Sequence, residues 1–279
     1  MTSRQTLAAL GSLSIYASVA RQLGDSASSP KLGPMDWQDH GLVIGVRPFG
    51  ETSGVAICLT EHHGRHSGLV RGIAGRRQRG VWQPGNRLAL VWSARLDDQL
   101  GSWRGEVEVA HAAAALSDAN ALAVLSAATA ILDATVPDRA PHPDLFAATD
   151  ALLSLGPNPG LGQAYVQWEL GLLASLGFGL DLSRCAISGV SAGLAFVSPR
   201  TGRAVSAAAA GPWRDRLLPL PRFLGEPEAT VGPPEAAEVM AALALTGHFL
   251  DRALLMPSRG IPAARSRLLD RLGSAATGG

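Results

Sequence analysis

The spacing of apolar residues changes near residue 110, and this change constrains the fold more than any other feature of the sequence. Residues 35–110 contain short segments rich in Val, Ile, Leu and Trp, separated by clusters of Gly and Pro. Apolar and polar residues alternate in segments such as Glu106–Val109, which is typical of strands. Beyond residue 110 the apolar spacing becomes helical. The sequence therefore predicts an α+β protein of more than one domain.

The first region is expected to hold five short strands. They are Gly41–Val46, Gly54–Thr60, His66–Ile73, Asn86–Arg95 and Trp103–Ala110. Five strands in so small a region favour a closed or nearly closed OB-fold β-barrel over residues 35–110.

The second region, residues 111–272, is expected to be mostly helical. The expected helices are Ala119–Thr135, Pro143–Leu155, Leu161–Leu176, Pro234–Met256 and Pro262–Leu272. Asp118 is a suitable N-cap for the first of them, and Gly177 is a suitable C-cap for the third. Residues 177–233 are rich in Gly and Pro and hold only short β-like segments, Leu194–Val197 and Arg203–Val205.

The two ends of the chain differ in composition from the rest. Residues 1–34 are typical of a flexible N-terminal extension that ends in a linker, and residues 273–279 of a disordered tail. Arg4 and the apolar stretch after it also match the start of a signal peptide, although Gly and Ser interrupt that stretch. Met35 opens the patterned region and is an alternative start of the protein. No apolar run reaches about 18 residues, so no transmembrane helix is expected.

Composition excludes several classes of function. Hydrophobic residues make up 47% of the 279 residues, which excludes global disorder. All basic residues except Lys31 are arginines, which removes the phosphate-binding loop, the kinase lysine and the Schiff-base lysine. Cys58 and Cys185 form neither a disulfide framework nor a four-thiolate zinc site, and they fit a reducing cytoplasm.

Positive charge is concentrated in the barrel region, although the net charge of the chain is only +1. Between His62 and Arg95 there are seven arginines and no acidic residue. These candidate DNA-binding residues are Arg65, Arg71, Arg76, Arg77, Arg79, Arg87 and Arg95. Gly75–Gly80 has the composition of a loop, so its three arginines are expected to face solvent. Arginine pairs with phosphate and stacks on bases, which favours nucleic acid over a merely solvated turn.

Three tryptophans of the barrel region, Trp82, Trp92 and Trp103, leave two interpretations open. Aromatic rings beside an arginine groove would suit the binding of single strands. Tryptophans in a small barrel more often fill its core, and we favour this interpretation for each of them.

Two motifs could indicate enzymatic or metal chemistry. Gly189–Gly193 matches Gly-x-Ser-x-Gly and would make Ser191 a hydrolase nucleophile, with His248 and Asp251 or Asp215 as partners. A strand is expected after this motif where the nucleophile elbow needs a helix, which opposes the hydrolase. A second motif, Glu61 with His62, His63 and His66, offers possible metal ligands. We expect these to be solvated histidines of a turn between strands, with no metal and no catalytic residue.

Longer motifs cover about residues 35–256. Those in the barrel region are Met35–Gly45, Arg47–Ser53, Leu59–Arg65, Gly68–Gly72 and Gln83–Gly85. Those in the helical region are Tyr165–Leu170, Leu176–Asp181, Ser198–Arg203 and Leu245–Leu250. The first set resembles the N-terminal OB-fold of the RecO recombination mediators. The second set resembles the central helix and further segments of that family, particularly of its proteobacterial members.

The resemblance implies a DNA repair and recombination mediator, not an enzyme. Such proteins bind single- and double-stranded DNA, anneal complementary strands and work with RecR. Together they help RecA replace single-stranded DNA-binding protein, whose acidic C-terminal tail contacts the helical domain. The implied location is the cytoplasm, at the nucleoid and without a membrane partner.

Many members of this family carry a zinc ribbon of two Cys-x-x-Cys pairs after the central helix. Here Cys185–Ser188 keeps one thiol of the first pair, and the second pair falls near Ser206 and Ala209. Because three of the four ligands are missing, we expect no zinc and no other cofactor. A degenerate ribbon-like insert at about 181–210 would then be held by packing of Leu182, Leu194, Phe196 and Val197.

These expectations define an OB-fold DNA-binding domain over 35–110 and a helical domain over 111–272. Three alternatives remain, namely a generic OB-fold nucleic-acid-binding module without mediator activity, a protein scaffold, and a serine hydrolase using Ser191. Four arginines of the second domain are further candidates for DNA contact: Arg200, Arg203, Arg214 and Arg216.

Overall fold

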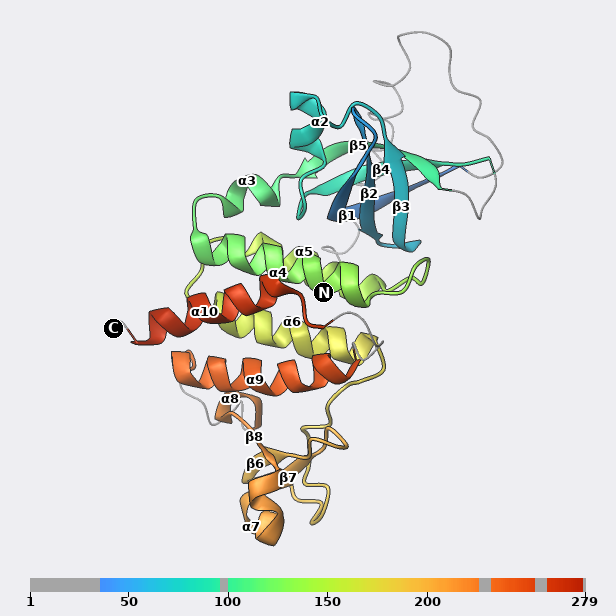
Figure 1. Ribbon diagram of the computed structural model, residues 1–279. Coiled ribbons are helices and arrows are strands. Elements are labelled where there is room, and N and C mark those ends of the chain that lie inside the picture. Colours follow the sequence, from blue (N-terminus) through green and yellow to red (C-terminus); the bar gives the residue numbers. More distant parts are fainter. Residues whose placement is uncertain (1–35, 96–99, 226–231, 254–259, 278–279) are drawn as a thin grey trace, which may run out of the picture.

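The computed structural model describes residues 36–95, 100–225, 232–253 and 260–277. The molecule has a β-barrel at one end, a stack of helices in the middle and a small β-subdomain at the other end (Figure 1). The expected extension at residues 1–34 and its possible signal peptide lie outside the described residues. The expected disordered tail is wrong for residues 273–277, because helix α10 (Ala263–Thr277) continues through them.

Five strands form the closed barrel, in the order β1-β2-β3-β5-β4. They are β1 (Trp37–Phe49), β2 (Ser53–Thr60), β3 (Gly64–Val70), β4 (Arg87–Ser93) and β5 (Gly101–Val109). All pairs are antiparallel except β3 with β5, and β1 pairs with both β2 and β4 to close the barrel. The expected OB-like barrel is confirmed, and each expected strand has its counterpart with shifted ends.

Tryptophan side chains fill the place where the barrel closes between β3 and β5. Gly68 lies opposite Gly101 in this pair of strands. A Cβ atom at Gly101 would lie 2.3 Å from Trp92, and one at Gly68 would lie 2.6 Å from Trp103. Both glycines are therefore needed for the indole rings to fit. Trp82, Trp92 and Trp103 are all buried, so the core interpretation is confirmed and none of them is open for stacking on a base.

The segment expected to be an exposed loop forms a short helix, α2 (Arg76–Val81). The loop prediction is wrong because it relied on the flanking glycines. Arg and Gln are good helix formers, and Gly75 serves as the N-cap without a side-chain hydrogen bond. The helix buries none of its own residues, so its arginines face solvent as expected.

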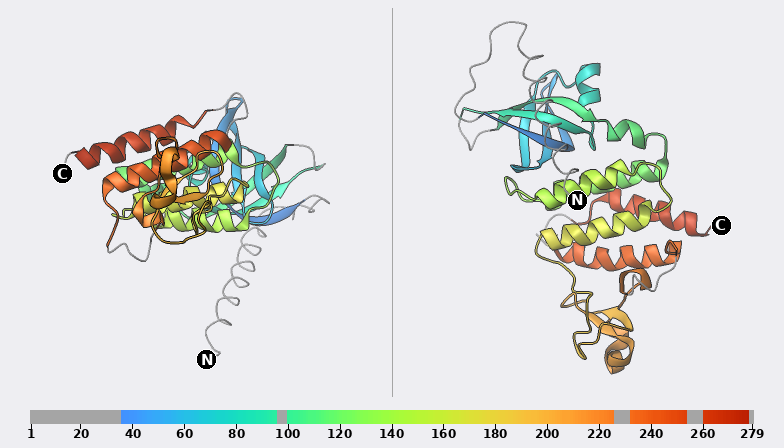
Figure 2. Two further views of the ribbon diagram at one scale, coloured as in Figure 1. Left: turned by 90° about the horizontal axis from the view of Figure 1, so that it is seen from below. Right: turned by 180° about the vertical axis from the view of Figure 1, so that it is seen from behind.

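Besides α2, six helices of the described residues make up the stack beside the barrel. They are α3 (His111–Ala115), α4 (Ala119–Thr135), α5 (Pro143–Ser154), α6 (Leu161–Ser175), α9 (Ala236–Ala253) and α10 (Ala263–Thr277). Asp118 caps α4 as expected, because its Oδ1 accepts a 2.7 Å hydrogen bond from the Ala121 amide. Helix α4 packs on β1 and on α10, whereas α6 lies between α5 and α9 (Figures 1 and 2).

The barrel and the helices share a continuous hydrophobic core. Leu42 and Ile57 of the barrel belong to the same buried cluster as Ile131 and Leu132 of α4. A second cluster around Trp82, Trp92 and Trp103 lies inside the barrel itself. The shared core fixes the barrel to the helical stack.

The segment between α6 and α9 forms the small β-subdomain. Its sheet has the order β7-β6-β8, with β6 (Leu194–Val197), β7 (Ala204–Ser206) and β8 (Leu218–Pro219). Short helices α7 (Ala207–Ala210), η1 (Gly211–Arg216, a 3₁₀ helix) and α8 (Arg222–Gly225) complete it. Leu194 and Val197 are buried, and Leu182 and Phe196 pack against the core, in accord with an insert held by packing.

No helix in the described parts of the chain combines the length and the apolar character that crossing a membrane requires.

Candidate nucleic-acid interface

Helix α2 is held on the barrel at its C-terminal end. Trp82, which is only 3% exposed, donates a 2.9 Å hydrogen bond from Nε1 to Oε1 of Gln78. The Asn86 amide donates to the carbonyls of Gly80 and Val81, at 3.0 and 3.1 Å. The same Asn86 accepts from the Ala112 amide at the start of α3. These bonds satisfy carbonyls at the helix end and fix α2 against the barrel.

Five of the seven candidate arginines are exposed, three on α2 itself and two just after the ends of β3 and β4. They are Arg71, Arg76, Arg77, Arg79 and Arg95. Among the described residues none of the five forms an ion pair with a carboxylate. Arg79 donates a 3.0 Å hydrogen bond to the Ala74 carbonyl, which orients its guanidinium beside the helix start. Helix α2 thus presents three exposed guanidiniums, those of Arg76, Arg77 and Arg79, and we call this basic face the α2 surface.

The other two candidates, Arg65 and Arg87, lie where the barrel meets the helices. Arg65 donates to Asp133 at 2.6 Å and also to Asp138. Arg87 donates to Asp150 at 2.6 Å and pairs with Glu108 at 3.3 Å. The sequence window contains no acid, but folding brings carboxylates from other segments to both guanidiniums. Arg65 and Arg87 therefore stabilise the domain contact, and the other five of the seven candidate arginines stay exposed to solvent.

Replacing Arg65 with Ala is expected to lower the free energy of unfolding by about 2 kcal/mol, because charge-assisted hydrogen bonds across the domain contact are lost. Arg71, which is exposed on the same barrel, provides the matched variant. Arg71→Ala is expected to keep wild-type stability and to weaken DNA binding instead. Urea unfolding and salt titrations of DNA affinity measure the two effects. If Arg65→Ala flattens the salt dependence as much as Arg71→Ala does, this division of the arginines is wrong.

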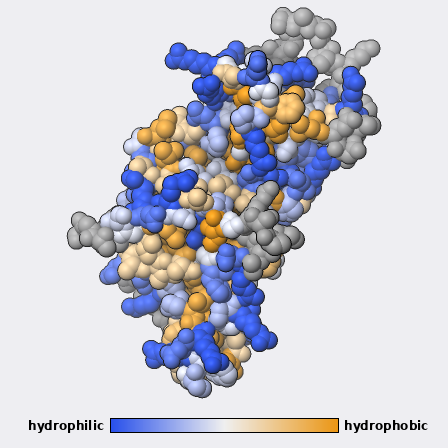
Figure 3. All heavy atoms as spheres, in the orientation of Figure 1, coloured by the Kyte–Doolittle hydropathy of each residue, from blue (hydrophilic) through white to orange (hydrophobic). Residues whose placement is uncertain are grey.

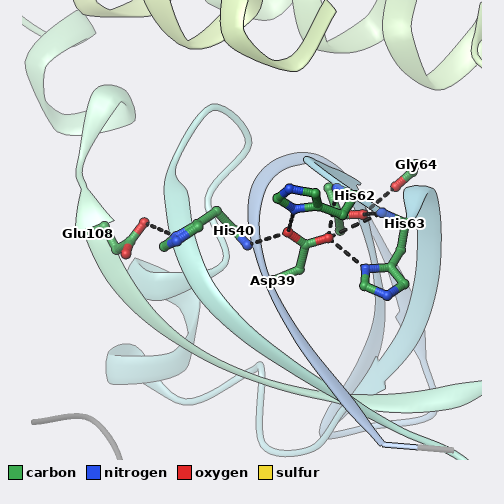
Figure 4. Close-up of polar contacts among 7 residues, drawn as sticks. Asp39, His40, His62, His63, Gly64 and Glu108 are labelled. Carbon is green, nitrogen blue, oxygen red and sulfur yellow. Dashed lines mark hydrogen bonds and ion pairs between the residues drawn. The ribbon is translucent and has the colours of Figure 1, made fainter. Parts of the chain in front are cut away.

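The histidine turn between β2 and β3 is organised by a buried carboxylate (Figure 4). The side chain of Asp39 is only 1% exposed and accepts hydrogen bonds from the backbone amides of His40, His62 and His63. The rings of His62 and His63 also bond to Asp39, with Nδ1–O distances of 3.0 and 2.7 Å. His62 and His63 lie in the turn with side chains 68% and 36% exposed, as expected of solvated turn histidines, but their bonds to Asp39 also fasten the turn to β1.

His66 is separate from this network and lies within β3. Its ring makes edge contacts with Trp37 and Trp92, with centroid distances of 5.1 and 4.9 Å. His66 is a buried residue of a strand, as the expected strand His66–Ile73 implies, so it is not a solvated turn histidine.

The turn network predicts a pH dependence of stability. Burial alone would raise the pKa of Asp39, but the hydrogen bonds from His63, His62 and the backbone hold it below the ordinary 3.8. The Asp39 bond raises the pKa of His62 above 6.5. The Asp39 contribution is therefore present above pH 3.8 and is lost as pH falls through its lower folded pKa. The His62 contribution is complete below pH 6.5 and is lost as pH rises through its higher folded pKa.

Asp39→Asn is accordingly expected to cost most stability between pH 3.8 and 6.5, where both partners are charged. The measurement is urea unfolding of wild type and variant at several pH values. Above that window the cost should shrink but persist, since the backbone amides still lose a charged acceptor. A cost that is the same at every pH from 4 to 8 would contradict this assignment.

Asp39, Glu61 and His62 also offer one ligand atom each within 4.8 Å of one another. Both oxygens of Asp39 already accept hydrogen bonds from the turn. A cation would have to displace these bonds, and we therefore assign the carboxylate a structural role.

The segment expected to be a degenerate zinc-ribbon-like insert lies in the β-subdomain. Cys185 is 1% exposed, and its Sγ accepts hydrogen bonds from the Ser188 amide at 3.5 Å and the Ser206 amide at 3.3 Å. Burial would raise the pKa of this thiol, but the bonds from Ser188 and Ser206 lower it to about 6. Folding thus brings together Cys185, Ser188 and Ser206, the positions that the resemblance pairs with the cysteines of a zinc ribbon. Serines in these positions do not provide the thiolate set that structural zinc requires, so the donors do not fit the metal.

Ser191 does not lie on a nucleophile elbow. It is exposed in a bend, and strand β6 follows where an elbow needs a helix. His248, its supposed base, instead contacts the Pro199 carbonyl through Nε2 at 3.2 Å. The geometry that a serine hydrolase requires is therefore not formed at this motif.

The fold and the α2 surface define a class of protein in which an OB-like barrel with an open basic face is fixed to a helical stack. Comparison with protein families matches residues 35–111 to the N-terminal part of Recombination protein O and residues 116–260 to its C-terminal part. The chain belongs to the Recombination protein O family.

Curated relatives cover most of the chain. A protein named DNA repair protein RecO from Rhodospirillum centenum is 50% identical over 246 residues, which are 87% of this chain and 97% of the relative. Proteins of the same name from Ruegeria sp. and Rhodospirillum rubrum are 50% and 46% identical, and the matches cover 85% of this chain and 98% and 96% of those relatives. The resemblance found in the sequence is therefore confirmed.

Proposed function

We propose that this protein is a DNA repair and recombination mediator that binds DNA through the α2 surface and anneals complementary single strands. The observation that carries the proposal is a set of five exposed arginines that pair with no carboxylate in the described part of the chain, namely Arg76, Arg77 and Arg79 on α2 and Arg71 and Arg95 elsewhere on the barrel. Family membership and the names of the relatives support the repair role. The α2 surface supplies the contact with phosphate that such a role needs.

Annealing follows physically from binding of this kind. Guanidiniums hold phosphates by charge and bidentate hydrogen bonds, without reading the sequence of bases. A basic surface screens the repulsion between two strands and so lowers the barrier to their encounter. The bases stay free to pair, because Trp82, Trp92 and Trp103 of the barrel are buried and do not stack on them.

The proposal extends to the assembly in which the protein works. We infer that it acts in the cytoplasm at the nucleoid, together with RecR, and helps to load RecA onto strands coated by single-stranded DNA-binding protein. The acidic tail of that binding protein would contact the helical domain, residues 111–272. In this role the protein makes and breaks no covalent bond.

The test is annealing of complementary oligonucleotides coated with single-stranded DNA-binding protein, with and without this protein, across a salt series. We expect acceleration that fades as salt rises, because electrostatic contacts release counterions. Tight binding to naked strands without any acceleration would leave only a generic nucleic-acid-binding module. No binding and no acceleration would leave a protein scaffold.

A further inference from the structure

The β-subdomain carries a second basic surface at the end of the molecule opposite to α2 (Figure 1). Residues 178–225 contain six arginines and two aspartates, and all six arginines are exposed. Hydrophilic side chains protrude at this end as they do near α2 (Figure 3). One aspartate, Asp181, pairs with Arg203 at 3.5 Å, and within the described residues no other carboxylate is paired with an arginine of this segment.

Helix η1 also presents an exposed aromatic ring. Of the six tryptophans in the chain, five are buried or partly buried, whereas Trp213 is 56% exposed. A large aromatic side chain left in solvent beside cations is a feature of binding surfaces. Stacking on the barrel tryptophans was the less favoured interpretation of the sequence, and the exposed tryptophan of the structure is Trp213 instead.

The geometry of η1 places cations next to the ring. In a 3₁₀ helix residues three apart eclipse each other, so Arg216 lies above Trp213, with its guanidinium 5.5 Å from the ring centroid. Asp215 falls on another side of this helix, away from the Trp213–Arg216 pair. Arg214 lies 5.5 Å from the ring of Phe196 on β6. One guanidinium over the indole leaves more than half of Trp213 open to a further planar partner.

From these observations we propose that Trp213 and Arg216, with Arg214 beside them, form a second contact for single-stranded DNA. A base stacks on the exposed indole and the guanidiniums bind the flanking phosphates. Single strands combine unpaired bases with phosphates and so match both parts of this surface. This inference rests on the proposed function, but it adds a site at the far end of the molecule. One chain could thereby hold one strand at two points.

The experiment uses the full chain and a labelled oligothymidylate. Trp213→Ala is expected to weaken binding about tenfold or more, the loss found when a stacking aromatic is removed. The salt dependence should stay as in wild type, because no charge is lost. Trp213→Phe keeps a ring and should restore most of the affinity. Ile187→Ala, an exposed apolar residue of the same subdomain, is the matched control and should bind like wild type.

A second readout reports the stacking itself. The oligonucleotide should quench part of the tryptophan fluorescence of wild type, and this part should be missing in Trp213→Phe. Wild-type affinity and quenching in the Trp213 variants, with weaker binding when the α2 arginines are replaced, would overturn this inference and leave the proposed function intact. No binding of wild type to the oligonucleotide would overturn both. Loss of annealing only on strands coated with binding protein would instead assign this surface to a protein contact and would overturn the inference.

Discussion

Glu169→Ala is expected to lower the free energy of unfolding by about 3–5 kcal/mol, a large part of the roughly 5–15 kcal/mol that stabilises a typical domain. Glu169 on α6 is fully buried and accepts two hydrogen bonds from Arg265 on α10, at 2.6 and 2.9 Å. Arg265 is only 4% exposed. Removal of the carboxylate would leave a buried guanidinium without its counter-charge.

The surrounding contacts show why this pair is central to the helical stack. Thr246 of α9 donates its hydroxyl to Glu169, and Arg265 also donates to the Leu243 carbonyl at 2.7 Å. A Cβ atom at Gly247 would lie 2.9 Å from the Arg265 guanidinium, so the glycine leaves room for the Arg265 side chain beside α9. The pair therefore joins α6, α9 and α10. Burial alone would lower the pKa of Arg265, but the bond to Glu169 raises it, which keeps the guanidinium charged.

Urea unfolding followed by circular dichroism measures the cost. The control is the double variant Glu169→Leu with Arg265→Met, which removes both charges and keeps apolar volume. It should recover most of the lost stability, because the penalty comes from the unpaired charge. A single variant within about 1 kcal/mol of wild type would show that the pair is not buried as described.

Replacing Arg76, Arg77 and Arg79 together with Ala is expected to weaken single-strand binding about a hundredfold at low salt, at about 1 kcal/mol for each lost contact. The slope of log affinity against log salt should become shallower by about 2, since each phosphate neutralised on a single strand contributes about 0.7. Stability should stay close to wild type, because all three side chains are exposed and α2 buries none of its residues.

Two controls separate position from charge in this experiment. Replacing the same three arginines with Lys keeps the charge and should keep the slope, while the loss of bidentate pairing lowers affinity only in part. Replacing Arg267 and Arg271 with Ala removes two exposed charges from α10 and should leave DNA binding unchanged. Equal losses in the α2 and α10 variants would show that DNA follows overall charge rather than the α2 surface.

Much of the fold could be predicted because it depends on local patterns. The helix Ala119–Thr135 and the strand Leu194–Val197 have the bounds expected from apolar spacing and from the Asp118 cap. Helix α2 was missed because its six residues, none of them buried, show no apolar period. Its only signal in the sequence was the run of Arg and Gln, which favour helix intrinsically.

The site could be predicted only in part, because its charges are paired by tertiary contacts. Arg65 and Arg87 meet carboxylates of Asp133, Asp138 and Asp150 that lie 63 to 73 positions away, which no local window reveals. Asp39 is 23 and 24 positions away from the two histidines that bond to it. Trp213 is exposed because it lies on η1, a short helix that buries none of its residues. In each case the residue type was visible in the sequence, but its partner or its exposure was set by packing.

The most direct test of the central claim is amide hydrogen exchange of the full chain with and without single-stranded DNA. A short helix with three neighbouring cations opens readily, and phosphate contacts relieve the repulsion among them. We predict slower exchange at residues 74–82, which include α2, when DNA binds. DNA-dependent protection elsewhere in the chain, with unchanged exchange at α2, would contradict the assignment of the α2 surface as the DNA interface.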